Sequence, residues 1–219
     1  MILLFGSIKG GVGKTTLATN ILYLRSKEKK RKMLLIDTDE QESATEWHEQ
    51  RTYRDIPVHW DCKFFTTEDF HKLVETGGID KLKEYYEDII IDTAGRLCKA
   101  QRCALTVADK FLVPFRPSFF DVNTLRHINT LLSEALKVNS KLQTFAVINQ
   151  ADSKGTDNCD ARNQISECPY LKCLPFHIGT RKSFRSSSSM GLAVCELEKK
   201  YKDKKANDEI NMLYDALYK

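Results

Sequence analysis

The sequence predicts an α/β fold, in which a mainly parallel, twisted sheet carries helices on both faces. Short apolar runs rich in β-branched and aromatic residues recur at residues 3–8, 33–38, 88–93, 110–114, 144–149 and 173–178. Longer stretches at residues 15–26, 42–50 and 122–136 carry apolar side chains at helical spacing. Such alternation of strand and helix signals is typical of parallel sheets. Within the third run, three consecutive isoleucines end at Ile91, as expected for a central strand that is covered on both faces.

Composition and length limit the class of protein. The chain has 219 residues and 42% hydrophobic content, which predicts one compact domain over residues 1–219. A net charge of +4 is too small to indicate nucleic-acid binding by itself. Seven cysteines without a paired CxxC framework are typical of reduced thiols and exclude a secreted disulfide scaffold. No leader-like or membrane-spanning apolar run is present, so we expect a cytoplasmic location.

A glycine-rich segment lies between the first predicted strand and the first predicted helix. It reads KGGVGKTT over residues 9–16, which is the context and spacing of a Walker A phosphate loop. Glycines let successive N–H groups turn toward an anion at a helix N-terminus. We therefore expect ATP phosphates to be bound by Gly10, Gly11, Val12, Gly13, Lys14, Thr15 and Thr16. Lys14 would neutralise the β and γ phosphates and the Thr15 hydroxyl would ligate Mg²⁺, unless the segment is an ordinary strand-to-helix turn.

Acidic residues end two of the predicted strands. Asp37 and Asp39 are separated by one residue, so in an extended chain they face the same side, where they repel unless a cation or ordered water lies between them. Asp92 closes the isoleucine run in the manner of a Walker B motif and is expected to hold Mg²⁺. The alternative for Asp37 and Asp39 is that both cap the next helix.

The lysine immediately before the double glycine makes KGGVGKTT resemble the deviant Walker A motif of the ParA/MinD family. This resemblance implies that Lys9 crosses to a second subunit and contacts its nucleotide, so that ATP drives homodimerisation. It also implies catalytic roles for Lys9, Lys14 and Asp39, with Asp39 orienting the attacking water. Asp37 corresponds to the family acid near the metal.

Three further positions are assigned by the same resemblance. Gly95 corresponds to a glycine whose backbone approaches the γ phosphate, and Asn149 to an asparagine that contacts adenine. Glu40 stands where the family has proline, which places the turn around Asp39 in question.

The C-terminal third adds basic residues followed by a G-x-x-V-x-E pattern over residues 191–196. The chain resembles short ParA-type partition proteins, which implies an ATPase whose dimer binds double-stranded DNA without sequence preference on the nucleoid. A centromere-binding or cargo adaptor protein would stimulate its hydrolysis. The DNA phosphates would contact Arg181, Lys182, Arg185, Lys199 and Lys200, with Lys202, Lys204 and Lys205 nearby. The alternative is an ordinary solvated basic face.

Two other classes of protein fit parts of the sequence. A MinD-like protein would place its C-terminal helix on lipid, and the apolar residues there are Ile210, Leu213, Tyr214, Leu217 and Tyr218. Acidic residues accompany this face, so we expect it to pack on the core without a membrane partner. Iron–sulfur relatives need cluster ligands, and Cys98 has no CxxC partner.

Overall fold

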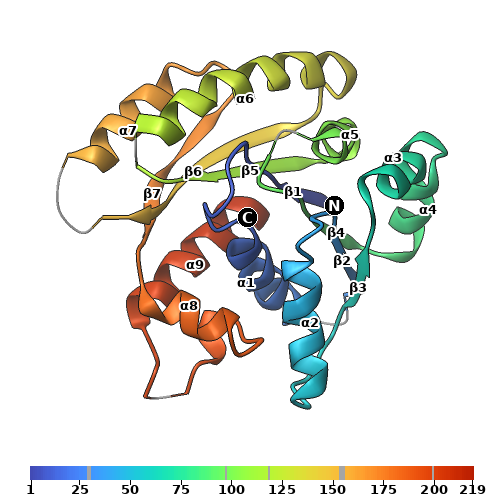
Figure 1. Ribbon diagram of the computed structural model, residues 1–219, viewed down its shortest axis with the longest axis vertical. Helices are drawn as coiled ribbons and strands as arrows, with labels where there is room; N and C mark the ends of the chain where they lie inside the picture. The colour runs from blue at the N-terminus through green and yellow to red at the C-terminus, as the bar shows by residue number, and fades with distance from the viewer. Residues whose placement is uncertain (29–30, 97, 118, 153–155, 199) are drawn as a thin grey trace.

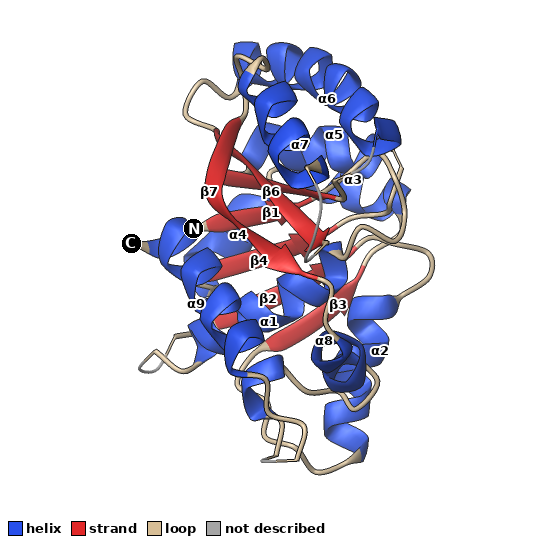
Figure 2. Cartoon of the chain, turned by 90° about the vertical axis from the view of Figure 1, so that its left-hand side faces the viewer, coloured by secondary structure: helices blue, strands red, loops and turns tan. Residues whose placement is uncertain are grey.

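The computed structural model describes residues 1–28, 31–96, 98–117, 119–152, 156–198 and 200–219. These residues form a seven-stranded sheet in the order β3-β2-β4-β1-β5-β6-β7, and every adjacent pair of strands is parallel. The strands are β1 (Ile2–Phe5), β2 (Met33–Asp37), β3 (Asp61–Phe64), β4 (Asp88–Asp92), β5 (Lys110–Phe115), β6 (Gln143–Ala151) and β7 (Lys172–Gly179). The predicted parallel sheet is confirmed, and Figure 2 shows the helices that flank it.

Two layers of helices cover the sheet (Figure 1). One layer consists of α3 (Thr67–Glu75), α4 (Gly78–Tyr85), α5 (Lys99–Val107), α6 (Phe119–Val138) and α7 (Asp157–Ser166). The other consists of α1 (Lys14–Ser26), α2 (Ser43–Tyr53), α8 (Lys182–Ser188), the 3₁₀ turn η1 (Val194–Glu196) and α9 (Lys204–Tyr218). Each layer has its own apolar core.

The central strands supply both cores, because successive side chains of a strand point to opposite faces. In β1, Ile2 and Leu4 pack with the α3–α7 layer, whereas Leu3 and Phe5 pack with the layer of α1. All four are fully buried. This arrangement explains why the central strands read as continuous apolar runs rather than as alternating ones.

The register of the sheet brings the carboxyl ends of three strands together. Asp92 at the end of β4 lies beside Asp37 of β2 on one side and beside Phe5 of β1 on the other. The phosphate loop follows β1 directly, so the predicted acidic residues and the loop meet at one edge of the sheet, where ligands bind in open α/β folds.

Two expectations need correction at the N-terminal half. The first strand ends at Phe5 rather than continuing to residue 8, and the loop begins at Gly6, where an added Cβ would lie 2.8 Å from the Phe111 ring. The strand β3 was not expected. It is an edge strand with the polar sequence DCKF and alternates between exposed and half-buried residues, so it lacks a long apolar run.

The C-terminal helix α9 packs on the core as predicted. Ile210, Leu213, Tyr214 and Leu217 are buried against the layer of α1. A run of serines at residues 186–189 forms the C-terminal end and cap of α8, and Ser187 within it is fully buried.

Candidate functional site

The phosphate loop connects β1 to α1 in a conformation that requires glycine at two positions. Gly11 has φ +73° and Gly13 has φ +88°, both in the left-handed region that side chains disfavour. Gly13 caps α1, and the carbonyl of Gly13 accepts the first intrahelical hydrogen bond, from the N–H of Leu17. The N-terminus of α1 therefore opens directly onto the loop, as an anion-binding site needs.

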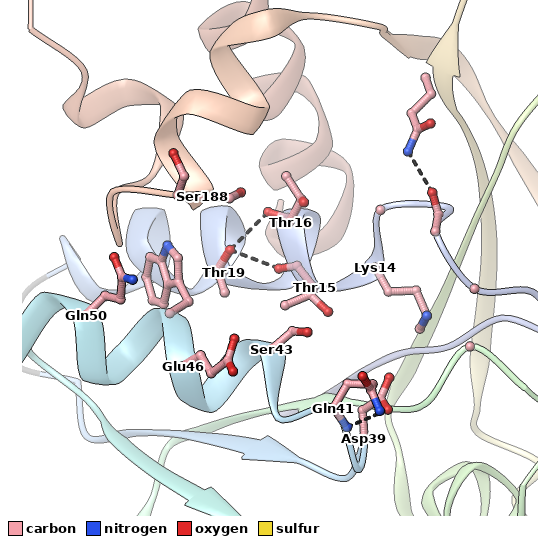
Figure 3. A pocket seen from close by; sticks show the side chains of 17 residues that line it. Lys14, Thr15, Thr16, Thr19, Asp39, Gln41, Ser43, Glu46, Gln50 and Ser188 are labelled. Atoms are coloured by element: carbon pink, nitrogen blue, oxygen red, sulfur yellow. Dashed lines mark hydrogen bonds between the residues drawn. The ribbon is translucent and has the colours of Figure 1, made fainter.

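A cavity of about 600 Å³ lies over this loop. Figure 3 shows Lys14 and Asp39 at one end of it, with Ser43 and Glu46 of α2 facing Thr15 and Thr19 of α1. Of the residues predicted to bind nucleotide or to act in catalysis, the lining includes Gly10, Gly11, Gly13, Lys14, Thr15, Thr16, Asp39 and Gly95. The structure thus brings most of the predicted phosphate site into one hollow.

Two residues of the predicted loop are placed differently from their neighbours. The Val12 side chain is buried, so this residue can offer only its backbone to a ligand. Lys9 is half-buried, and its carbonyl accepts a hydrogen bond of 2.6 Å from the Ser7 hydroxyl. Lys9 precedes the cavity rather than lining it, so its role toward a second subunit stays a prediction.

Thr15 and Asp92 form the centre of the predicted metal site. The Thr15 hydroxyl donates to Asp92 Oδ2 at 2.5 Å, while the buried Oδ1 of Asp92 has no hydrogen-bond partner. Burial raises the pKa of Asp92 to about 7, and nearby Lys14 opposes that shift. A buried, unpartnered carboxylate oxygen beside a hydroxyl fits a hard cation with oxygen ligands, such as Mg²⁺. Thr15 and Asp92 would hold that ion, which would neutralise phosphate charge when bound.

Asp37 lies beside Asp92 but is committed to the backbone of α2. Its Oδ1 accepts from the N–H of Asp39, and its Oδ2 accepts from the N–H groups of Ala44 and Thr45, each at 3.0 Å. Burial raises the pKa of Asp37, and these amide hydrogen bonds oppose the shift. For Asp37 the geometry is that of the capping alternative, and its part in metal binding stays a prediction.

The turn around Asp39 forms without the family proline. The Asp39 carbonyl accepts from the N–H of Glu42 at 2.8 Å, and Asp39 Oδ1 accepts from the N–H of Gln41 at 3.2 Å. Glu40 points away and pairs with Arg96 at the surface, 3.1 Å apart. Asp39 therefore lines the cavity with its side chain although Glu40 replaces proline.

Gly95 lines the cavity, and its backbone approaches the phosphate loop closely. An added Cβ at Gly95 would lie 2.4 Å from Gly10 Cα and 2.7 Å from Gly10 N, closer than any real contact. The two backbone segments can therefore approach only because residue 95 is glycine.

A second cavity of about 460 Å³ adjoins the first across Gly13 and Thr16. Asn149, the predicted adenine contact, lines it, but Asn149 Nδ2 also donates to the carbonyl of Val12 at 2.7 Å. Asn149 thus supports the loop, and its contact with adenine stays a prediction.

The predicted DNA-binding residues fall into two groups. Arg181 is paired with Glu209 of α9, its Nε lying 2.9 Å from Glu209 Oε2, and so it is held within the protein. Lys182, Arg185 and Lys200 are exposed. Lys199 lies outside the described residues. Their role toward DNA stays a prediction.

Sequence reasoning missed several residues of the site. Ser43, Glu46, Trp47, Gln50, Ser188 and Ser189 line the first cavity from α2 and from the end of α8. The serine run and the amphipathic pattern of residues 42–50 were visible signals, but neither indicated which side chains face the nucleotide site. Arg116 and Gln150 also contact the loop, and no local motif marks them.

Among the described residues, no helix has the length and apolar character needed to cross a membrane. Cys98 caps α5, its Sγ accepting from the N–H of Gln101 at 3.5 Å, and the part of the chain that the structure describes contains no group of metal-ligating side chains sufficient for a cluster.

A parallel sheet with a glycine-rich loop, a buried aspartate hydrogen-bonded to a threonine and adjoining cavities defines a P-loop nucleotide-binding domain. Residues 3–192 match the family described as the CobQ/CobB/MinD/ParA nucleotide binding domain. The chain belongs to this family, as the KGGVGKTT resemblance predicted.

Individual proteins agree with this assignment. The maintenance of carboxysome distribution protein A of Halothiobacillus neapolitanus is 24% identical, over 96% of this chain and 93% of that protein. Protein IncC of Escherichia coli is 25% identical over 63% of this chain, but the match spans only 38% of IncC. A plasmid partition protein of Borrelia burgdorferi, solved with AMPPNP, superposes with a TM-score of 0.74 over 98% of each chain at 22% identity, which shows the shared fold.

Proposed function

We propose that this protein is a ParA-type ATPase that positions a cargo, with ATP and Mg²⁺ bound at the two cavities over the phosphate loop. The observation that carries the proposal is the buried Asp92 beside Thr15, because its unpartnered oxygen is placed for a cation at the mouth of a phosphate loop. The relatives named above support it, since their names describe distribution of carboxysomes and partition of plasmids.

In this proposal the residues act in sequence. The loop amides and Lys14 bind the phosphates, and Lys9 reaches the nucleotide of a second subunit, so that ATP drives formation of a homodimer. Asp39 orients the attacking water toward the γ phosphate. The Gly95 backbone moves when that phosphate is lost, and this movement returns the dimer to monomers.

The dimer would bind nucleoid DNA in the cytoplasm through exposed basic residues. Lys182 and Arg185 lie on α8, whose end lines the first cavity at Ser188. Because Arg181 is already paired with Glu209, we assign the phosphate contacts to Lys182, Arg185 and Lys200. An adaptor protein bound to the cargo would stimulate hydrolysis.

Binding of unrelated double-stranded DNA tests the proposal. The protein is measured with ATP, with ADP and without nucleotide across a salt series. We expect binding only with ATP, weakening as salt rises and independent of DNA sequence. Arg185→Glu should abolish it, whereas Arg126→Glu, an exposed arginine on α6 in the opposite layer, should leave it unchanged.

Two further variants separate the steps of the cycle. Lys14→Ala should lose nucleotide binding, and Asp39→Ala should keep ATP and accumulate as a dimer in size-exclusion chromatography with light scattering. ATP-driven dimers without DNA binding in any state would reject the DNA step and favour direct positioning of a protein cargo. Normal ATP turnover by Asp39→Ala would remove Asp39 from the mechanism.

A further inference from the structure

Three side chains from the ends of β5 and β6 hold two consecutive carbonyl groups of the phosphate loop. The Gly11 carbonyl accepts from Arg116 Nη2 and from Gln150 Nε2, each at 2.9 Å. The next carbonyl, that of Val12, accepts from Asn149 Nδ2 at 2.7 Å. The strands of the sheet therefore fix this part of the loop through contacts far apart in sequence.

These contacts determine the direction of the loop amides. In a planar trans peptide unit the C=O and the following N–H point in opposite directions. Fixing the Gly11 carbonyl toward Arg116 and Gln150 therefore turns the Val12 N–H the other way. Fixing the Val12 carbonyl does the same for the Gly13 N–H. The left-handed φ angles of Gly11 and Gly13 permit these orientations of the carbonyl and N–H groups, as in other anion-binding loops.

Gln150 is itself held in an unfavourable conformation. Its φ of +54° lies in the left-handed region, which is uncommon for a residue other than glycine or asparagine. The surrounding structure maintains this conformation, and it places the amide against Gly11. Gln150 also lines both cavities, so the contact lies at the junction of the phosphate end and the base end of the site.

We infer that Arg116 and Gln150 are positioning residues that preorganise the phosphate loop, so that the Val12 amide faces the nucleotide phosphates before nucleotide binds. This inference rests on the proposed function, because it assumes that the loop binds a nucleotide. Preorganised donors bind the phosphate without first ordering the loop, which favours affinity for ground and transition states alike.

The test compares nucleotide affinity with turnover in four variants. Gln150→Glu keeps the size of the side chain but turns an acceptor toward the Gly11 carbonyl, and Arg116→Ala removes a charged donor. We expect each to weaken ADP binding about tenfold in calorimetry. Arg116→Lys keeps a donor and should restore most of the affinity. Arg126→Ala, at an exposed arginine on α6, is the matched control and should bind as the wild type does.

Two readouts separate positioning from a general loss of structure. KM for ATP should rise while kcat at saturation stays within about twofold, because the lost interaction is common to the ground and transition states. Hydrogen exchange of the loop peptide covering residues 9–14, measured without nucleotide, should accelerate in Gln150→Glu and Arg116→Ala while the thermal midpoint is unchanged.

The outcomes distinguish the two levels of proposal. Wild-type protein that binds neither ADP nor ATP would reject the proposed function. Wild-type binding with unchanged affinity and unchanged loop exchange in both Gln150→Glu and Arg116→Ala would overturn the positioning role and leave the proposed function standing. A fall in kcat with unchanged KM would also overturn it.

Discussion

The hydroxyl of Thr15 lies 2.5 Å from Asp92 Oδ2, joining the first turn of α1 to the end of β4. The hydrogen bond brings the Thr15 hydroxyl beside the Asp92 carboxylate, whose other oxygen has no hydrogen-bond partner. Thr15 lies in the first turn of α1 and Asp92 is the last residue of β4, so the fold sets their geometry.

Removing the Thr15 hydroxyl should weaken the effect of Mg²⁺ on nucleotide binding. Thr15→Val keeps the shape of the side chain but offers no oxygen, so we expect the Mg²⁺-dependent gain in ATP affinity to fall about tenfold or more. Thr15→Ser, which keeps the hydroxyl, should retain most of it. Titrations of ATP with and without Mg²⁺ check this. An equal Mg²⁺ effect in wild type and Thr15→Val would contradict the assignment of Thr15 to the metal.

A methyl group at Gly95 should destabilise the nucleotide-free protein. In Gly95→Ala the new Cβ would meet backbone atoms of Gly10, which cannot move aside as a side chain would. We expect a loss of about 1–3 kcal/mol in the free energy of unfolding. Gly10→Ala is the control, because an added Cβ there meets no atom within 4 Å, and its effect should stay below about 0.5 kcal/mol. Urea denaturation of both variants measures the difference, and equal stabilities would contradict the close approach.

The loop and the central strands were predictable because their signals are local. The spacing of the glycines and lysines over residues 9–16 predicts a phosphate loop. The run of isoleucines predicts the strand that ends at Asp92, and the structure buries every residue of that strand. The edge strand β3 was not predictable, since one half-exposed polar segment of four residues resembles a loop.

Contacts between distant segments could not be predicted either. Arg116 and Gln150 reach Gly11 only after the sheet has aligned the ends of β5 and β6. The pairing of Arg181 with Glu209 depends in the same way on where α9 packs. Sequence pattern identifies residue types suited to a role. Tertiary packing decides whether such a residue is already paired with another residue of the chain.

Breaking the pair between Arg51 and Glu196 should be costly. Arg51 is 1% exposed, and its Nη1 and Nη2 donate to Glu196 at 2.6 and 2.9 Å. The guanidinium also lies beside the stacked rings of Trp47 and Trp60, 5.2 Å from each ring centroid. Arg51→Met leaves the Glu196 carboxylate without this partner, so we expect a loss of about 3 kcal/mol in the free energy of unfolding.

An exposed ion pair provides the comparison for this variant. Glu40 and Arg96 are 3.1 Å apart, but more than 60% of each side chain is exposed. Glu40→Gln should therefore cost less than about 1 kcal/mol. Chemical denaturation of both variants decides the matter. If Arg51→Met cost no more than Glu40→Gln, the buried pair would contribute nothing beyond a surface pair.

The half-buried imidazole of His48 should make stability depend on pH. Burial lowers the pKa of His48, Arg51 lowers it further, and Glu49 and Asp61 act in the opposite direction. Because the folded-state pKa lies below the ordinary value of about 6.5, the unfolded chain binds more protons than the folded one near pH 6. The free energy of unfolding should therefore rise with pH through this window. It should fall as pH drops from about 6.5 through the folded-state pKa.

Replacing His48 with glutamine removes the titrating group while keeping a polar side chain of similar size. We expect the thermal midpoint of His48→Gln to change less than that of wild type between about pH 5 and pH 7.5. His59→Gln changes an exposed histidine in the same part of the chain and controls for the loss of an imidazole at the surface. The Nδ1 atom of His48 is buried and has no hydrogen-bond partner, so we expect the pH dependence of the thermal midpoint to arise from this residue. Identical pH profiles for wild type and His48→Gln would show that protonation of His48 is not coupled to folding.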